Sequence, residues 1–181
     1  MKQFFVIVVC CAGFLLSMGT PPERLAWSPD SKVDWHQFKG MPNTTDGYAA
    51  TTSTGLSQSY EIDGHGYLNK GGTTIIAYFY PEFSWYRPKD TTAYLLSHER
   101  SHFDITEIHA RKLRKRISEY AFTSKSKAEI KALYNKVEEE RQLMQSQFDA
   151  ESDHSRNREQ EEIWHTVIRK MLEEYGVYTS L

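Results

Sequence analysis

The pattern of hydrophobic and polar positions changes its period once along the chain, near residue 90. Before that point, short runs rich in β-branched and aromatic residues alternate with Asp-Gly and Gly-Gly pairs. Runs of this kind, bounded by turn residues, are typical of strands. We expect strands at residues 48–54, 58–62, 73–80 and 84–86, which form a small antiparallel sheet.

After residue 90, apolar residues recur at helical spacing and predict three helices. Asp90 can cap the first helix. Ser126 and Glu129 fit a capping box at the start of the second. The third helix is expected at residues 158–175, with Gly176 as a natural stop. The fold class is therefore α+β, a sheet followed by a layer of three helices.

The first 19 residues predict a signal peptide. Lys2 precedes an apolar run at 4–16, and the small residues Ser17 and Gly19 occupy the −3 and −1 positions of a cleavage site. The run is shorter than the roughly 20 residues that cross a bilayer, although an uncleaved anchor is the alternative. We expect an exported protein, periplasmic or secreted, without a stable membrane span after cleavage.

The rest of the chain, residues 20–181, is expected to form a single domain, mainly β over 20–88 and mainly α over 89–181. Cys10 and Cys11 lie inside the predicted signal, so we expect a mature domain without a disulfide that is held by its core, with a bound metal as a further source of stability to consider. A lipid anchor on Cys10 is disfavoured, because a lipoprotein signal has a small residue where Val9 stands.

The net charge of −2 shows no broad basic face, so we expect no nucleic-acid partner. One basic run, at residues 111–116, ends the first helix. We interpret it as cations that complement the helix C-terminus rather than as a membrane or nucleic-acid patch.

The candidate chemistry lies in the motif His98-Glu99-Arg100-Ser101-His102. Residues four apart share a helix face, so both imidazoles can bind one Zn²⁺ ion. Zinc lowers the pKa of a bound water toward about 7, and Glu99 can act as the general base. A β segment followed by such a helix is the zincin-like arrangement, which favours a catalytic metal over the alternative of two surface histidines without a metal.

A third ligand is not supplied by the rest of the same helix. His109 lies seven residues beyond His102, which is about 10 Å along a helix axis. Asp104 and Glu107 are rotated away from the face that His98 and His102 share. We therefore expect the third ligand to come from a later helix.

A short connection makes the first two helices antiparallel, which places residues 145–152 beside the two histidines. His154 is the best donor near that segment. Three carboxylates remain as alternatives: Asp149, Glu151 and Asp153. The other histidines outside the first helix have no such geometric support: His36, His65 and His165.

The run Leu-Leu-Ser-His-Glu-Arg-Ser-His-Phe-Asp-Ile at residues 95–105 resembles a bacterial family of domains of unknown function described as predicted secreted zinc-dependent proteases. Four further segments are similar to the family's pattern: residues 35–40, 84–85, 110–114 and 148–154. The resemblance implies that His98 and His102 are metal ligands, that Glu99 is the catalytic acid/base and that His154 is suited to ligation. The sequence departs from the pattern at three positions: Phe148, Ser152 and Ser155.

These observations predict an exported zinc-dependent hydrolase, a metallopeptidase acting on a peptide or protein substrate. The alternative is a non-catalytic cell-envelope domain whose zinc site is structural or vestigial. Such a domain would bind partners through the aromatic residues of its sheet: Tyr78, Tyr80, Trp85 and Tyr86.

Overall fold

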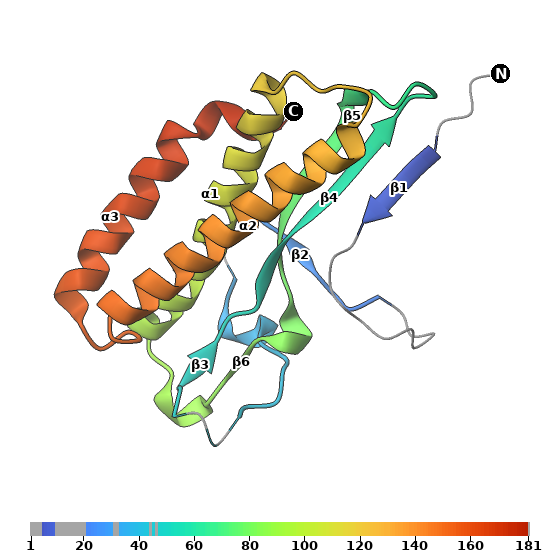
Figure 1. Ribbon diagram of the computed structural model, residues 1–181. Helices are drawn as coiled ribbons and strands as arrows, with labels where there is room; N and C mark the ends of the chain where they lie inside the picture. The colour runs from blue at the N-terminus through green and yellow to red at the C-terminus, as the bar shows by residue number, and fades with distance from the viewer. Residues whose placement is uncertain (1–4, 10–20, 31–32, 44, 46, 181) are drawn as a thin grey trace.

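A computed structural model describes residues 5–9, 21–30, 33–43, 45 and 47–180 of the chain (Figure 1). It confirms the α+β class, with a small antiparallel sheet and three long helices. Within the described part of the chain, none of the helices combines the length and apolarity that crossing a membrane requires.

The main sheet has four antiparallel strands in the spatial order β1 (Phe5–Val9), β4 (Thr54–Ile62), β5 (Leu68–Phe79) and β2 (Leu25–Ala26). A two-stranded sheet pairs β3 (Ala50–Thr51) with β6 (Trp85–Tyr86). The predicted signal peptide overlaps β1 and otherwise falls outside the described residues. The strands expected at 58–62 and 73–80 are confirmed as parts of the longer β4 and β5.

The β4–β5 hairpin is defined by alternating burial and by its turn. On β5, Ile75, Ala77 and Phe79 are buried at alternate positions, as expected for a strand with one face on a core. The turn needs glycine at Gly66, which has φ +89°, and a Cβ there would lie 2.2 Å from the carbonyl oxygen of Ser124. This close approach joins the hairpin to the start of the second helix.

The three helices are α1 (Ala93–Glu119), α2 (Ser126–Glu151) and α3 (Arg158–Glu174). The cap expected at Asp90 is wrong, because Asp90 ends a short 3₁₀ helix that begins at Pro88. Thr92 caps α1 instead, and its hydroxyl accepts a hydrogen bond from Leu95 N at 3.0 Å.

The second helix begins at Ser126 as expected, but its capping box is wrong. Ser126 is the first helical residue, the N-cap position is Lys125, and no side chain caps the helix. The Ser126 hydroxyl donates to the carbonyl of Gly66. Glu129 instead accepts from the backbone N and the hydroxyl of Thr123, at 2.9 and 2.6 Å.

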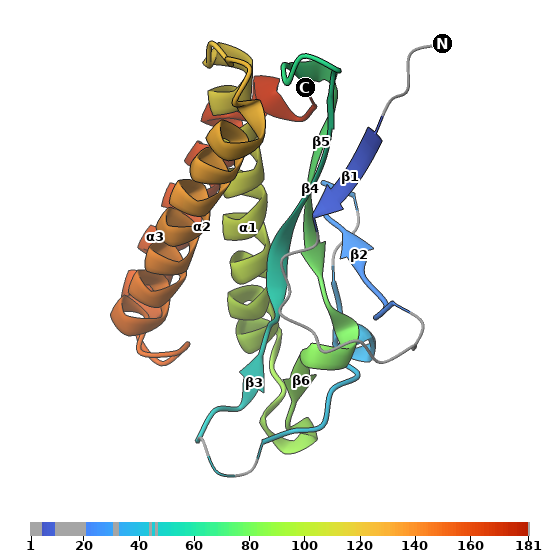
Figure 2. The same cartoon turned by 45° about the vertical axis from the view of Figure 1, so that its right-hand side comes forward.

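Helix α1 lies between the sheet on one side and α2 and α3 on the other (Figure 2). Toward the sheet it buries residues such as Ala110, Leu113 and Ile117, in a core that also contains the inward residues of β5. Toward the other helices it buries Ile105 and Ile108. Because nearly all its faces are covered, α1 can place polar groups deep inside the molecule.

Two arginines of the basic run, Arg111 and Arg114, make tertiary contacts, whereas Arg116 lies in the last turn of α1, where the sequence interpretation has a cation beside the helix C-terminus. Arg111 and Arg114 are buried, and both pair with Glu107. Arg111 also donates to the carbonyl of Leu172 at 2.6 Å, and Arg114 to that of Tyr178 at 3.1 Å. These cations fasten the C-terminal part of the chain to α1.

Candidate metal centre

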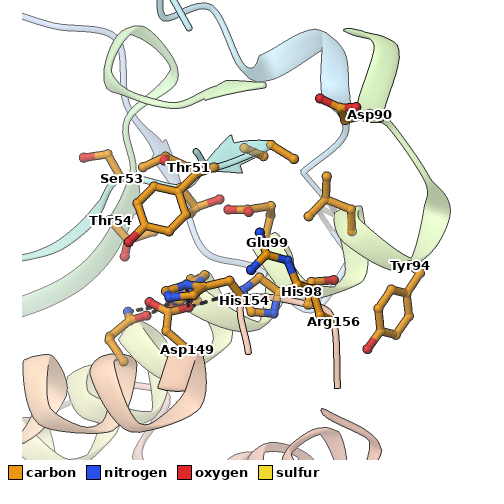
Figure 3. Close-up of a pocket in the computed structure, with 18 of the residues that line it drawn as sticks. Thr51, Ser53, Thr54, Asp90, Tyr94, His98, Glu99, Asp149, His154 and Arg156 are labelled. Carbon is orange, nitrogen blue, oxygen red and sulfur yellow. Dashed lines mark hydrogen bonds and ion pairs between the residues drawn. The ribbon is translucent and has the colours of Figure 1, made fainter. Parts of the chain in front are cut away.

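His98 and His102 of α1 and Asp149 of α2 bring one potential ligand atom each to within 4.8 Å of one another. His98 and Asp149 are labelled among the cavity-lining residues of Figure 3. Oδ1 of Asp149 lies 3.3 Å from Nε2 of His98 and 3.0 Å from Nε2 of His102. Two imidazole nitrogens and a carboxylate oxygen that converge on one point could hold a metal ion.

The antiparallel packing of α1 and α2 positions this group. Gln145, one turn before Asp149 on α2, donates from Nε2 to the carbonyl of His102 at 3.0 Å. Oε1 of Gln145 contacts Nδ1 of the His102 ring, so the other ring nitrogen, Nε2, is directed at Asp149. The sequence-based expectation that residues 145–152 lie beside the two histidines is confirmed.

Phe148 forms the apolar side of the centre. It is fully buried, and its ring stacks on His98 with 4.5 Å between centroids and 23° between planes. It meets His102 edge-on at 5.2 Å. Packing against Phe148 therefore restricts the orientation of both imidazole rings.

The three side chains are strongly coupled electrostatically. Burial opposes the charged form of His98, but Asp149 and Glu161 outweigh it and raise the pKa of His98 to about 9. Burial also opposes ionisation of Asp149, yet hydrogen bonds from His102 and His98 hold the pKa of Asp149 well below its usual range. A field that holds a proton this firmly also stabilises a bound cation.

Glu99 follows His98 on α1 and lines the same cavity as the three candidate ligands. It is 4% exposed, and its Oε2 has no hydrogen-bond partner among the described residues. Glu99, His98, His102 and Asp149 all line one cavity of about 850 Å³. The structure thus combines a buried carboxylate with the candidate ligands in the lining of one cavity.

His154 lines the same cavity and lies on the turn after α2. Its Nδ1 is 3.9 Å from Oδ1 of Asp149, and its ring is 4.8 Å from that of Tyr48. It has φ +50° between two residues that also have positive φ, Asp153 and Ser155. His154 does not join the three-residue group, so its role as a ligand stays a prediction.

The other two carboxylates near this turn have different partners. Glu151 accepts a hydrogen bond from Trp164 Nε1 at 2.8 Å. Asp153 is exposed and pairs with Arg156 at 3.8 Å. Among the alternatives to His154, only Asp149 reaches the two histidines.

The residues excluded by helix geometry do lie elsewhere. Asp104 accepts from Trp27 Nε1 at 2.7 Å, and Glu107 pairs with two arginines. Nδ1 of His109 lies 2.8 Å from the carbonyl oxygen of Ile105, and burial lowers the pKa of His109 to about 4. None of these three belongs to the metal-ligand group found in the described part of the chain.

Sequence reasoning missed Glu161 of α3. It is fully buried, and its Oε2 accepts a hydrogen bond from the hydroxyl of Tyr94 at 2.7 Å. The same oxygen lies 3.5 Å from Nδ1 of His98. Glu159 and Glu162 stand nearby on the same turn, so the sequence held no signal that singles out Glu161.

Two of the aromatic residues considered as a binding surface belong to the packing of the sheet. Trp85 is 8% exposed. Tyr86 lies against Trp35 and Phe38, with centroid distances of 5.0 and 6.2 Å. These contacts assign both side chains to structural support at the β3–β6 end of the molecule.

Residues 33–155 match the model of a family of bacterial proteins of unknown function. The matched segment contains His98, Glu99, His102, Asp149 and His154. Comparison with curated proteins and with solved structures gives no match.

Proposed function

The chain belongs to this family of bacterial proteins of unknown function, DUF922, and from its metal centre we propose that it is a zinc-dependent hydrolase, a metallopeptidase. One observation carries the proposal. His98, His102 and Asp149 line one cavity together with Glu99, a buried carboxylate whose Oε2 has no hydrogen-bond partner among the described residues.

The donor set fits zinc. Imidazole nitrogen and carboxylate oxygen are both common zinc ligands, and three protein ligands with an open fourth position are typical of catalytic sites. Structural zinc sites are closed by four protein ligands. The cavity beside Asp149 supports the catalytic reading, because it leaves room for water and substrate.

When bound, zinc would supply a Lewis acid that polarises a carbonyl and lowers the pKa of water. Glu99 would take a proton from the attacking water and return it to the leaving amine as the C–N bond breaks. Gln145 and Phe148 would keep the rings of His102 and His98 in place during the reaction.

A peptide or protein substrate fits the opposite wall of the cavity. That wall is the extended segment 47–54, which includes β3 and the first residue of β4. Thr51, Ser53 and Thr54 lie across the cavity from Glu99 (Figure 3). Hydroxyl and backbone groups on an extended segment can hydrogen-bond the main chain of a peptide. With the predicted signal peptide, we place this activity in the periplasm or outside the cell.

The structural alternative has one specific observation in its favour. His154 lies close enough to Asp149 that a turn movement could bring it in as a fourth protein ligand. Such a closed site would exclude water and leave Glu99 without a catalytic role.

The test compares wild type, Glu99→Gln and His102→Ala for bound metal and for cleavage of a broad peptide library. We expect about one zinc per wild-type chain. Glu99→Gln should keep the zinc and lose about 10²- to 10⁴-fold in hydrolysis, the usual worth of a general base. His102→Ala should lose both. Wild type without stoichiometric zinc would refute the proposal, and unchanged hydrolysis in Glu99→Gln would refute the role of Glu99.

A further inference from the structure

Glu161 is a carboxylate on α3 with no solvent exposure, and it lies outside the segment matched by the family model. Its Oε2 accepts from the Tyr94 hydroxyl and lies 3.5 Å from Nδ1 of His98. Its Oε1 lies 3.7 Å from Nε2 of His165. Burial of an ionised carboxylate costs free energy unless hydrogen-bonding or charged partners compensate for the lost hydration. The partners of Glu161 therefore indicate what this buried side chain does.

The contact with His98 defines that role chemically. His98 presents Nε2 to Asp149 and Nδ1 to Glu161, so its two nitrogens face two different carboxylates. A metal-binding histidine generally donates its other N–H to such a group, which fixes the tautomer and the ring orientation. Nδ1 of His98 is buried without a hydrogen bond from the described residues, so the carboxylate 3.5 Å away is the acceptor in reach.

We infer that Glu161 is a positioning residue of the metal centre, which orients His98 so that Nε2 faces the ion. The inference rests on the proposed metal site, but not on the proposed hydrolysis. The hydroxyl of Tyr94 fixes the carboxylate, and the guanidinium of Arg158 lies 4.6 Å above the Tyr94 ring. The functional unit therefore extends beyond residue 155 to include α3.

Helix α3 is anchored firmly enough for this role. Trp164 of α3 donates to Glu151 of α2, and Arg111 of α1 donates to the carbonyl of Leu172 near the end of α3. Ile168 is buried in the cluster that the three helices share. The position of Glu161 relative to His98 is thus set by contacts in the middle of the helix and near its C-terminal end.

The experiment measures Zn²⁺ affinity of the full chain by competition with a chelator, for wild type, Glu161→Gln and Glu162→Gln. Glu162 is exposed on the same turn and is the matched control for loss of one negative charge. We expect Glu161→Gln to bind zinc about 10- to 100-fold more weakly, the range known for such outer partners, and Glu162→Gln to match wild type. The visible spectrum of the Co²⁺-loaded protein should change in Glu161→Gln alone, because the His98 ligand is no longer held in one orientation.

Tyr94→Phe keeps the Glu161 carboxylate and removes the hydroxyl that fixes it. We therefore expect this variant to weaken zinc binding, but by a smaller factor than Glu161→Gln. Circular dichroism and the melting temperature of the metal-free variants show whether each has folded. Wild-type affinity and an unchanged Co²⁺ spectrum in folded Glu161→Gln would overturn the inference and leave the hydrolase proposal standing. Equal losses in Glu161→Gln and Glu162→Gln would overturn it too. A wild type that binds no zinc would remove the proposed function together with the inference.

Discussion

At the scale of single residues, the centre depends most on Asp149, because its Oδ1 lies within hydrogen-bonding or ion-pairing reach of both histidine Nε2 atoms. We expect Asp149→Asn to lower zinc affinity by more than the roughly 10- to 100-fold that outer partners contribute. His154→Ala should cost less, since its side chain is 39% exposed and stands outside the three-residue group. Zinc titration of both variants measures which of the two substitutions lowers the affinity more. A larger loss in His154→Ala would make His154 the third ligand.

His109 gives a residue-scale prediction for pH. Burial lowers its pKa from 6.5 in the unfolded chain to about 4, against a smaller opposing effect of the Ile105 carbonyl. Between these values the unfolded state binds more protons, so stability falls as the pH drops from 6.5 toward 4. The lost free energy of unfolding should be on the order of 3 kcal/mol.

Denaturant unfolding of wild type and His109→Gln across that pH window tests this dependence. The glutamine does not titrate, so its curve should lose less stability over the same window, and the difference between the two curves isolates His109 from the other ionising groups. Parallel curves would show that His109 is not a buried neutral histidine.

At the scale of elements, the sequence was sufficient to predict those parts of the fold that local hydrophobic periodicity determines. Helical spacing predicted all three helices, and the short link between the first two predicted their antiparallel pairing. From that pairing alone, the segment around Asp149 was predicted to lie beside His98 and His102 of α1. The helix caps were predicted poorly, because Ser126 and Glu129 use their side chains for contacts with Gly66 and Thr123 that no local pattern encodes.

The remaining parts of the site depend on long-range packing. The choice between Asp149 and His154 is set by the end of α2 and by three consecutive residues with positive φ, which sequence spacing does not reveal. Glu161 comes close to His98 only because α3 packs on α1. In the sequence it is one of several glutamates at the start of a helix.

At the scale of the whole molecule, a bound metal would link α1 directly to α2, and through Glu161 to α3. Because the unfolded chain does not assemble this group, binding should stabilise the fold. At a free zinc concentration 100 times the dissociation constant, the gain is about 2.7 kcal/mol. For a domain of this size, that corresponds to a rise in melting temperature of roughly 5–11 °C.

Differential scanning calorimetry with zinc and with a chelator measures this shift. Wild type should melt at the higher temperature in zinc, and the shift should grow with zinc concentration because binding is linked to folding. His102→Ala serves as the control, since it lacks one of the three ligands and should melt at the same temperature in both buffers. If wild type also melted identically in both, His98, His102 and Asp149 would be a buried ion-pair cluster rather than a metal centre. Their close approach would then reflect only the charge of Asp149 between two imidazoles.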